Sequence, residues 1–455
     1  MKKNTARTKR LDRLNESPPP HGAVEHIESF AFGPELIGER FRFGNGLQLL
    51  FVKDDSAPVT AYHTWYRVGS RHESRGKTGL AHLFEHLMFK ETENFGAGEF
   101  DRRLEEAGAE SNAGTWFDWT HYHVAIPTSH IGLIVRLEAE RMTRLILKDP
   151  QVASEKEVVA NERRYRVDDD VESTASELLW ATAFTTHAYH SPTIGWMQDI
   201  DGFTTEDCVA FYRTFYAPNN ATLIVVGSVS EAALLSKIQA AYGHIPPSRL
   251  PFEDVRPEPS QTDERRREIL QPTQSDKVLI GYKSPALGDF DHPALSVLNE
   301  VLFGGRASRV HSKLVRELEL ATDLRSFVSP FRDPGLLEIF ASARGSHRAE
   351  LLLDTIDREL ASVRHEAVRE DELARAKARL ELGLVAGLET ADGKASTVGF
   401  YEVVLGRPNA AFERLDAVRS VTASDVVRVA RRYLLESNRT LVLVRPNKTE
   451  AEAAQ

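Results

Sequence analysis

The chain has 455 residues, with 57 lysines and arginines against 67 aspartates and glutamates, and a single cysteine. A hydrophobic share of 41% favours folded domains over a mostly disordered chain, and the length fits two or three domains of about 150 residues. The net charge of −10 argues against sequence-independent binding of DNA or RNA, which needs clustered cations. Because Cys208 stands alone, a disulfide framework and a cysteine-based zinc module are excluded.

The amino-terminal segment is basic and polar, and then rich in proline. It lacks the apolar core of about 7–15 residues that a secretory signal requires. No apolar run in the chain reaches the length of about 18 residues needed for a transmembrane helix. We therefore expect a disordered tail over 1–24, no membrane span and a cytoplasmic location.

Ordered structure is expected from about Glu39, beginning with a hairpin whose turn is Gly44-Asn45-Gly46. Helical spacing of apolar residues is clearest over 79–89, and Ser154 is a candidate N-cap for a later helix. In chain order, the pattern predicts a hairpin over 42–52, a strand over 59–68, helices over 79–89 and 100–107, a strand over 116–126, and helices over 130–147 and 154–167.

The second half of the chain repeats a segment of the first. Residues 203–226 align with 421–444, and both copies read as a threonine cap, a helix, an asparagine-containing turn and an apolar strand. The identical pairs are Thr204/Thr422, Asp207/Asp425, Val209/Val427, Arg213/Arg431, Asn220/Asn438, Thr222/Thr440, Leu223/Leu441 and Val226/Val444. This fixed-offset similarity predicts a duplicated domain.

A proline-rich, charged stretch separates the two copies, as is typical of a linker. We predict a first domain over 25–250, a linker over 251–265, a second domain over 266–447 and a tail over 448–455. Strands and helices mix in each half without strict alternation, which favours an α+β fold built of two homologous domains.

The residues with the clearest chemistry are His82, Glu85 and His86, which lie inside the strongest helical pattern. Two histidines four residues apart project from one helical face and can bind one metal ion. A zinc ion held by neutral imidazoles lowers the pKa of a bound water to about 7. Glu85 is then placed to accept the proton of that water and to deliver it to the leaving amine.

A catalytic zinc site usually takes a third protein ligand from another element. The predicted helix over 154–167 offers Glu155 and Glu162, seven residues apart and therefore on one face. One of them can bind the metal while the other supports the site from behind the ligands. The residues alone do not choose between the two. Other histidines, among them His121, His123, His187 and His190, are interpreted as core or surface residues.

Several segments together resemble the pitrilysin/insulinase peptidases, family M16, which carry an inverted zinc motif. They are Gly69-Ser70-Arg71, Glu73, the run from Gly79 to Lys90 that reads GLAHLFEHLMFK, and Asn112-Ala113. In that family a distal glutamate follows the second histidine by about 76 residues, and Glu162 stands at that distance from His86. The resemblance thus implies one Zn²⁺ per chain on His82, His86 and Glu162, Glu85 as the base, and a supporting role for Glu155.

The resemblance also implies two α+β domains, each a mostly antiparallel sheet packed with helices. It implies a chamber formed with a second chain, as in the dimeric, processing-peptidase-like M16B branch. The family position of Asn112 contacts the substrate backbone, and the strand from Ala113 pairs with the peptide. From the residues alone, Asn112-Ala113-Gly114 reads as a turn into a strand.

One departure from the family pattern concerns an arginine and a tyrosine that bind substrate. Thr322 stands where the tyrosine is expected, and Arg316 lies slightly out of register. We expect either a homologous partner that supplies an arginine and a tyrosine, as a homodimer or heterodimer, or replacement by Arg309 or Arg316. The predicted function is zinc-dependent endopeptidase; the alternatives are a structural or assembly subunit with the same fold and a metal-binding module without hydrolase activity.

Overall fold

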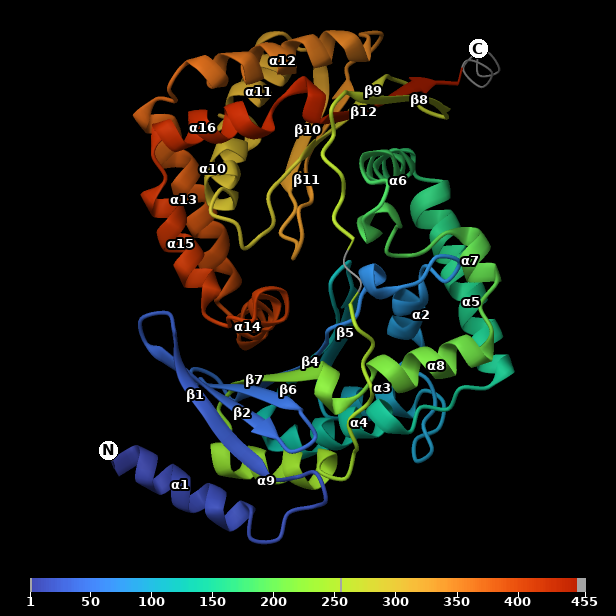
Figure 1. The fold of residues 1–455 in the computed structure, drawn as a ribbon, viewed down its shortest axis with the longest axis vertical. Helices are drawn as coiled ribbons and strands as arrows, with labels where there is room; N and C mark the ends of the chain where they lie inside the picture. Colours follow the sequence, from blue (N-terminus) through green and yellow to red (C-terminus); the bar gives the residue numbers. More distant parts are fainter. Residues whose placement is uncertain (1, 254–255, 448–455) are drawn as a thin grey trace. The chain divides into compact units, whose positions relative to one another are not determined.

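The computed structural model describes residues 2–253 and 256–447 (Figure 1); the predicted tail over 448–455 lies outside them. The chain divides into two compact units, neither of which is continuous in sequence. Unit 1 comprises Met1–Ala160, Thr193–Asp254 and Ala386–Phe412, and unit 2 comprises Asn161–Pro192, Val255–Val385 and Glu413–Gln455.

Unit 1 is built on a seven-stranded sheet in the order β1-β2-β3-β7-β4-β6-β5. Every neighbouring pair is antiparallel except β3 and β7, which run parallel. The predicted hairpin is confirmed as β2 and β3, with Gly46 at a φ of 86° in the turn. The strands are β1 (Val24–Phe32), β2 (Leu36–Phe43), β3 (Gln48–Lys53), β4 (Val59–Tyr66), β5 (Glu110–Thr115), β6 (Thr120–Pro127) and β7 (Ala221–Gly227).

Helices cover both faces of this sheet. Tyr62, Tyr66 and Tyr122 point to one face and pack with apolar residues of α2, α4, α8 and α9. Trp65 and its neighbours on the other face pack against α14. The helices of unit 1 are α1 (Lys2–Leu14), α2 (Leu80–Leu87), α3 (Glu99–Glu106), α4 (Ile131–Thr143), most of α5 (Asp149–Arg163), α7 (Met197–Asp201), α8 (Thr205–Phe215), α9 (Glu231–Tyr242) and α14 (Ala391–Leu405).

Unit 2 has a five-stranded sheet in the order β10-β11-β9-β12-β8, in which only β12 and β8 are parallel. Helix α6 covers one face, and α10, α12 and α16 pack on the other. The strands are β8 (Arg265–Gln271), β9 (Lys277–Lys283), β10 (Ala321–Val328), β11 (Leu336–Ala343) and β12 (Arg439–Pro446). The helices are α6 (Val171–Ala183), α10 (His292–Phe303), α11 (Arg309–His311), α12 (Ala349–His365), α13 (Glu370–Gly387), α15 (Ala410–Ser420) and α16 (Ala423–Tyr433).

The two sheets share one topology, so the predicted duplication and α+β class are confirmed. The order β3-β7-β4-β6-β5 corresponds to β8-β12-β9-β11-β10, with the parallel pair in the same place. In both copies a threonine, Thr204 or Thr422, forms a capping box at the start of the helix that precedes the central strand. These boxes satisfy backbone N–H groups that the first helical turn leaves open.

Several local expectations differ from the structure, beginning with the start of order near Glu39, since β1 already begins at Val24. The segment 1–24 is not a disordered tail, because α1 forms within it and Arg7 bonds both Glu39 and Glu231 at 2.9 and 3.0 Å. These partners are distant in sequence, so local composition could not reveal them. Helix α5 begins at Asp149, so Ser154 lies inside the helix instead of capping it.

Strand β5 contains Asn112-Ala113-Gly114, so the strand that the resemblance implies from Ala113 is present, whereas the turn that the residues alone favour is not. Across 2–253 and 256–447, no helix combines the length and apolar character that crossing a bilayer requires. The compartment and the sequence-based domain limits stay predictions.

Candidate active site

Helix α2 carries His82, Glu85 and His86 in unit 1. Its residues Leu83, Phe84 and Leu87 have no exposed surface, so apolar packing fixes which face of the helix is turned to the core. Its N-cap, Gly79, has a φ of 97°, a backbone conformation that L side chains rarely adopt. A Cβ there would also lie 2.5 Å from the carbonyl oxygen of Ile194.

The start of α2 is held by the carboxylate of Glu73. This group accepts hydrogen bonds from the backbone N–H groups of Gly79 and Ala81, both at 2.7 Å. These are donors that a helix leaves unsatisfied in its first turn. Withdrawal from water raises the pKa of Glu73 to about 8, although the two hydrogen bonds act in the opposite direction. Glu73 therefore positions the helix that bears the histidines.

Donor atoms of His82, His86 and Glu162 all lie within 4.8 Å of one another. The two imidazole rings are 5.0 Å apart between centroids and inclined by 69°. Glu162 lies in the last turn of α5, a continuous helix that begins in unit 1. Two imidazoles and one carboxylate form a donor set that zinc takes in catalytic sites. The residues present therefore fit a zinc ion.

Glu155 lies elsewhere, behind one of the histidines. Its side chain is buried, with one oxygen 3.8 Å from Nδ1 of His86 and the other 2.6 Å from Nζ of Lys90. A carboxylate on the outer nitrogen of a metal-binding histidine orients the ring and raises its basicity. This placement suits Glu155 to a supporting role.

Glu85 is half-buried between the two histidines on α2. Burial, with a smaller contribution from the charge of Glu85, raises the pKa of both Tyr122 and Tyr216. The hydroxyl of Tyr122 donates to the backbone oxygen of Phe84 at 3.0 Å. The carboxylate thus lies close to a group of buried tyrosines that stay protonated and neutral.

Strand β5 forms one edge of the seven-stranded sheet and contacts helix α2. Asn112 is exposed on this strand, and its side-chain oxygen accepts a hydrogen bond from the N–H of Ala113 at 2.8 Å. An edge strand offers backbone groups with which an extended peptide can pair. The two residues predicted to bind substrate therefore lie on an edge strand beside the histidine-bearing helix.

The remaining predicted substrate-binding residues belong to unit 2. Arg316 is exposed in a π-helical segment, Ser312–Glu317, and Thr322 is exposed on β10. Arg309 donates two hydrogen bonds to Glu372, at 2.8 and 2.7 Å. Because this ion pair holds its guanidinium, Arg309 is poorly suited to replace the family arginine.

The sequence by itself indicates no role for Lys90, Thr78 or Asp199. Lys90 follows His86 by four residues but lies beyond the end of α2, so helical spacing does not account for its contact with Glu155. The hydroxyl of Thr78 donates to Asp199 at 2.6 Å, which ties the segment before α2 to α7. The contact between Thr78 and Asp199 joins residues distant in sequence, so no local sequence pattern predicts it.

Two family models match the chain. The model of the insulinase peptidases, family M16, matches residues 49–195, and that of the M16 inactive domain matches residues 202–380. The zinc protease PqqE of Helicobacter pylori is 31% identical over 433 residues, covering 93% of this chain and 96% of that protein. An uncharacterized zinc protease of Streptomyces coelicolor is 26% identical, over 90% of this chain and 91% of its own length.

Among solved structures, a protease from Helicobacter pylori superposes with a TM-score of 0.85. It is 30% identical in sequence, and the match covers 93% of this chain and all of that chain.

Proposed function

Because the chain belongs to the M16 family of zinc proteases, we propose that it is an endopeptidase with one catalytic zinc ion per chain. The observation that carries this proposal is the grouping of His82, His86 and Glu162 around a common point. Glu85 lies on the same helix, between the two histidines. Relatives that match over most of the chain are named zinc proteases, which favours a peptidase over an assembly subunit or a metal-binding module.

His82, His86 and Glu162 would hold the ion, which supplies Lewis acidity to activate water and polarise the peptide carbonyl. Glu85 acts as the general base and then as the acid that protonates the leaving amine. Glu155 keeps the ring of His86 oriented through its Nδ1 side. Glu73 fixes the start of α2 and with it the position of both histidines.

The substrate is a peptide or an unfolded polypeptide segment, bound in extended form along β5. Asn112 and Ala113 provide the contacts to its backbone, as the edge position of β5 favours. Such pairing uses hydrogen bonds to the peptide backbone, so it accepts varied side chains. It also requires an extended segment, so folded chains are excluded. Cleavage takes place in a chamber that this chain encloses with a second subunit.

The second subunit is a homologous M16 chain that supplies an arginine and a tyrosine to the substrate. Two observations support this part of the proposal. Thr322 stands where a tyrosine is expected, and its side chain is too short to reach as far as a phenol. Arg309 is engaged by Glu372. Arg316, which is exposed, is the alternative within this chain to an arginine of the partner.

The central test is the Glu85→Gln variant, assayed on an unfolded peptide. We expect hydrolysis to fall by about 10²–10⁴-fold, since general acid–base catalysis commonly contributes that much. Zinc content, measured by mass spectrometry, should equal that of the wild type because Glu85 is not a ligand. Glu157→Gln, on an exposed position of α5, is the matched control and should remain active. If the Glu85→Gln variant still hydrolysed the peptide at the wild-type rate, Glu85 would not be the general base.

A further inference from the structure

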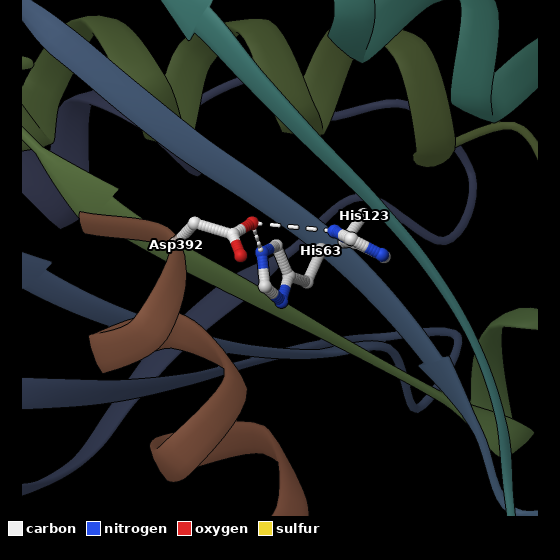
Figure 2. Close-up of side chains that lie close together, drawn as sticks. All are labelled: His63, His123 and Asp392. Atoms are coloured by element: carbon white, nitrogen blue, oxygen red, sulfur yellow. Dashed lines mark hydrogen bonds and ion pairs between the residues drawn. The ribbon is translucent and has the colours of Figure 1, made fainter. Parts of the chain in front are cut away.

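A second group of potential metal ligands lies in unit 1, on the face of the sheet opposite to α2. It consists of His63 on β4, His123 on β6 and Asp392 in the first turn of α14, with donor atoms all within 4.8 Å of one another. Figure 2 shows both imidazole rings turned toward the same carboxylate. His63 and His123 are direct cross-strand partners, so their side chains share one face.

The distances suit a bound ion. Oδ1 of Asp392 lies 2.8 Å from Nε2 of His63 and 3.3 Å from Nδ1 of His123. Ligand atoms about 2.0–2.2 Å from a tetrahedral zinc ion are roughly 3.3–3.6 Å apart, so small side-chain shifts would admit a metal. The side chain of His63 is 0% exposed, whereas His123 and Asp392 are 26% and 36% exposed. An ion could therefore reach the group from the solvent side.

Neighbouring rings fix the orientation of His123. Its ring stacks on His121 with centroids 5.0 Å apart and planes inclined by 12°. His121 in turn stacks on Trp65 at 4.4 Å. A stacked ring loses little further freedom when it binds a metal, which favours a preformed site.

The corresponding place in unit 2 is built differently. There α6 packs on β9 and β12, as α14 packs on β4 and β7. The strand pairing sets Leu279 and Phe340 at the positions of His63 and His123. The second residue of α6 is Glu172, as Asp392 is the second residue of α14.

In unit 2 the helix carboxylate is neutralised by cations of the chain itself. Glu172 pairs with Arg325 and with Lys277, the latter at 3.5 Å, and both cations lie over the ring of Phe340. In unit 1, two imidazoles take the place of the apolar pair and face Asp392. Imidazole nitrogens with a carboxylate are metal ligands, and a divalent ion would supply the positive charge.

We propose that His63, His123 and Asp392 form a second metal site, which binds a divalent transition-metal ion such as zinc. The ion ties α14 to β4 and β6. The segment that carries α14 belongs to unit 1, whereas the chain before and after it belongs to unit 2. The site therefore stabilises the attachment of this inserted segment, independently of the proposed catalytic zinc.

The test uses the His82→Ala/His86→Ala double variant of the full chain, which lacks the proposed catalytic ligands. After chelator treatment and dialysis, it is titrated with Co²⁺ and, separately, with Zn²⁺. We expect one ion per chain to bind saturably, and visible absorption of Co²⁺ coordinated by nitrogen and oxygen. Addition of Asp392→Asn should weaken binding by at least about 10-fold, as losses at metal sites typically do.

Asp392→Asn is chosen because the amide oxygen can still accept hydrogen bonds from both histidines. Circular dichroism without metal should therefore match that of the parent, and His123→Gln provides a second variant if it does not. His130→Gln, at an exposed histidine outside the group, should leave Co²⁺ binding unchanged. Absence of saturable binding in the double variant, or binding unaffected by Asp392→Asn and His123→Gln, would overturn the proposal. None of these measurements depends on peptidase activity.

Discussion

At the scale of residues, the two glutamates of α5 show how position separates groups of identical chemistry. A carboxylate oxygen of Glu162 lies within 4.8 Å of donor nitrogens of both His82 and His86. The same carboxylate also forms an ion pair with Arg166 at 2.9 Å. Glu155 faces the outer side of His86 and the ammonium group of Lys90. The same side chain is thus placed either to bind a metal or to orient a ligand of that metal.

This difference predicts unequal effects of removing the two charges. Glu155→Gln should weaken zinc binding by about 10–100-fold, the usual effect of changing a group behind a ligand. Glu162→Gln should weaken it further, because a neutral amide is a poor zinc ligand. Zinc affinity is measured by competition with a chelator, with Glu157→Gln as control. The reverse order would exchange the roles of Glu155 and Glu162.

A second residue with an unusual environment is Glu338 on β11. Its carboxylate accepts hydrogen bonds from the indole of Trp180 at 2.9 Å and the hydroxyl of Ser176 at 3.2 Å. Burial raises the pKa of Glu338 to about 7, although both hydrogen bonds lower it. The folded state therefore binds this proton more tightly than the unfolded state does.

The contribution of Glu338 to the free energy of unfolding is greatest below a pH of about 4.5 and is lost as the pH rises through 7. The reason is that the raised pKa favours the protonated native state. Glu338→Gln removes this titration. We expect variant and wild type to have similar free energies of unfolding at pH 5. At pH 8.5 the variant should be more stable by about 2 kcal/mol, from the pKa shift. Denaturant unfolding at both pH values checks this, and equal pH dependence of the two proteins would contradict it.

At the scale of elements, function depends on where strands and helices begin and on which edges they leave. Capping boxes start α8 and α16, and a glycine with positive φ starts α2. Strand β5 ends the sheet order and contacts α2. An edge beside the histidine-bearing helix gives the proposed peptide a place to pair.

The edge-strand proposal is tested by Ala113→Pro. Proline lacks the N–H that Ala113 now donates to Asn112, and edge positions tolerate proline better than central ones. We expect KM for an extended peptide to rise by about 10-fold, as one or two lost hydrogen bonds would give. Zinc content should not change. Ala113→Ser keeps the N–H and serves as the control, and an unchanged KM for the proline variant would refute pairing at Ala113.

At the scale of the whole molecule, the duplication has produced two units with one sheet topology but different chemistry. Unit 1 carries α2 with its HxxEH motif, whereas the helix of the second copy, α10, reads HPALSVLNEVLF. Each unit also contains a helix whose neighbours in the chain belong to the other unit, namely α14 in unit 1 and α6 in unit 2. The units are therefore not independent segments of sequence.

The proposed partner gives a prediction at this scale. The chain purified alone should hydrolyse an unfolded peptide about 10²–10³-fold more slowly than the complex from the native source, because a missing donor to the developing charge costs that much. Zinc content per chain should be equal in both preparations. Full activity from a homodimer of this chain would contradict the need for a different partner.

Local pattern determined much of this protein. The helical spacing around His82, the capping threonines and the repeated segment are all encoded within short windows, so the zinc motif, the α+β class and the duplication could be predicted from the sequence. The strand β5 and the start of α5 were predicted less well. Their limits depend on pairing and packing, which short windows do not contain.

The tertiary structure determined which residues, far apart in the sequence, lie close together in space. It brought Glu162 instead of Glu155 to the point shared by His82 and His86. Ion pairs of Arg7 with Glu39 and Glu231 hold α1 in place. Helix α6 belongs to unit 2 and α14 to unit 1, although the chain before and after each of them belongs to the other unit. The tertiary structure also brought Asp392 to His63 and His123. Each outcome depends on contacts across tens to hundreds of residues, whose free energy is realised only when the sheets are packed, and a linear pattern does not display it.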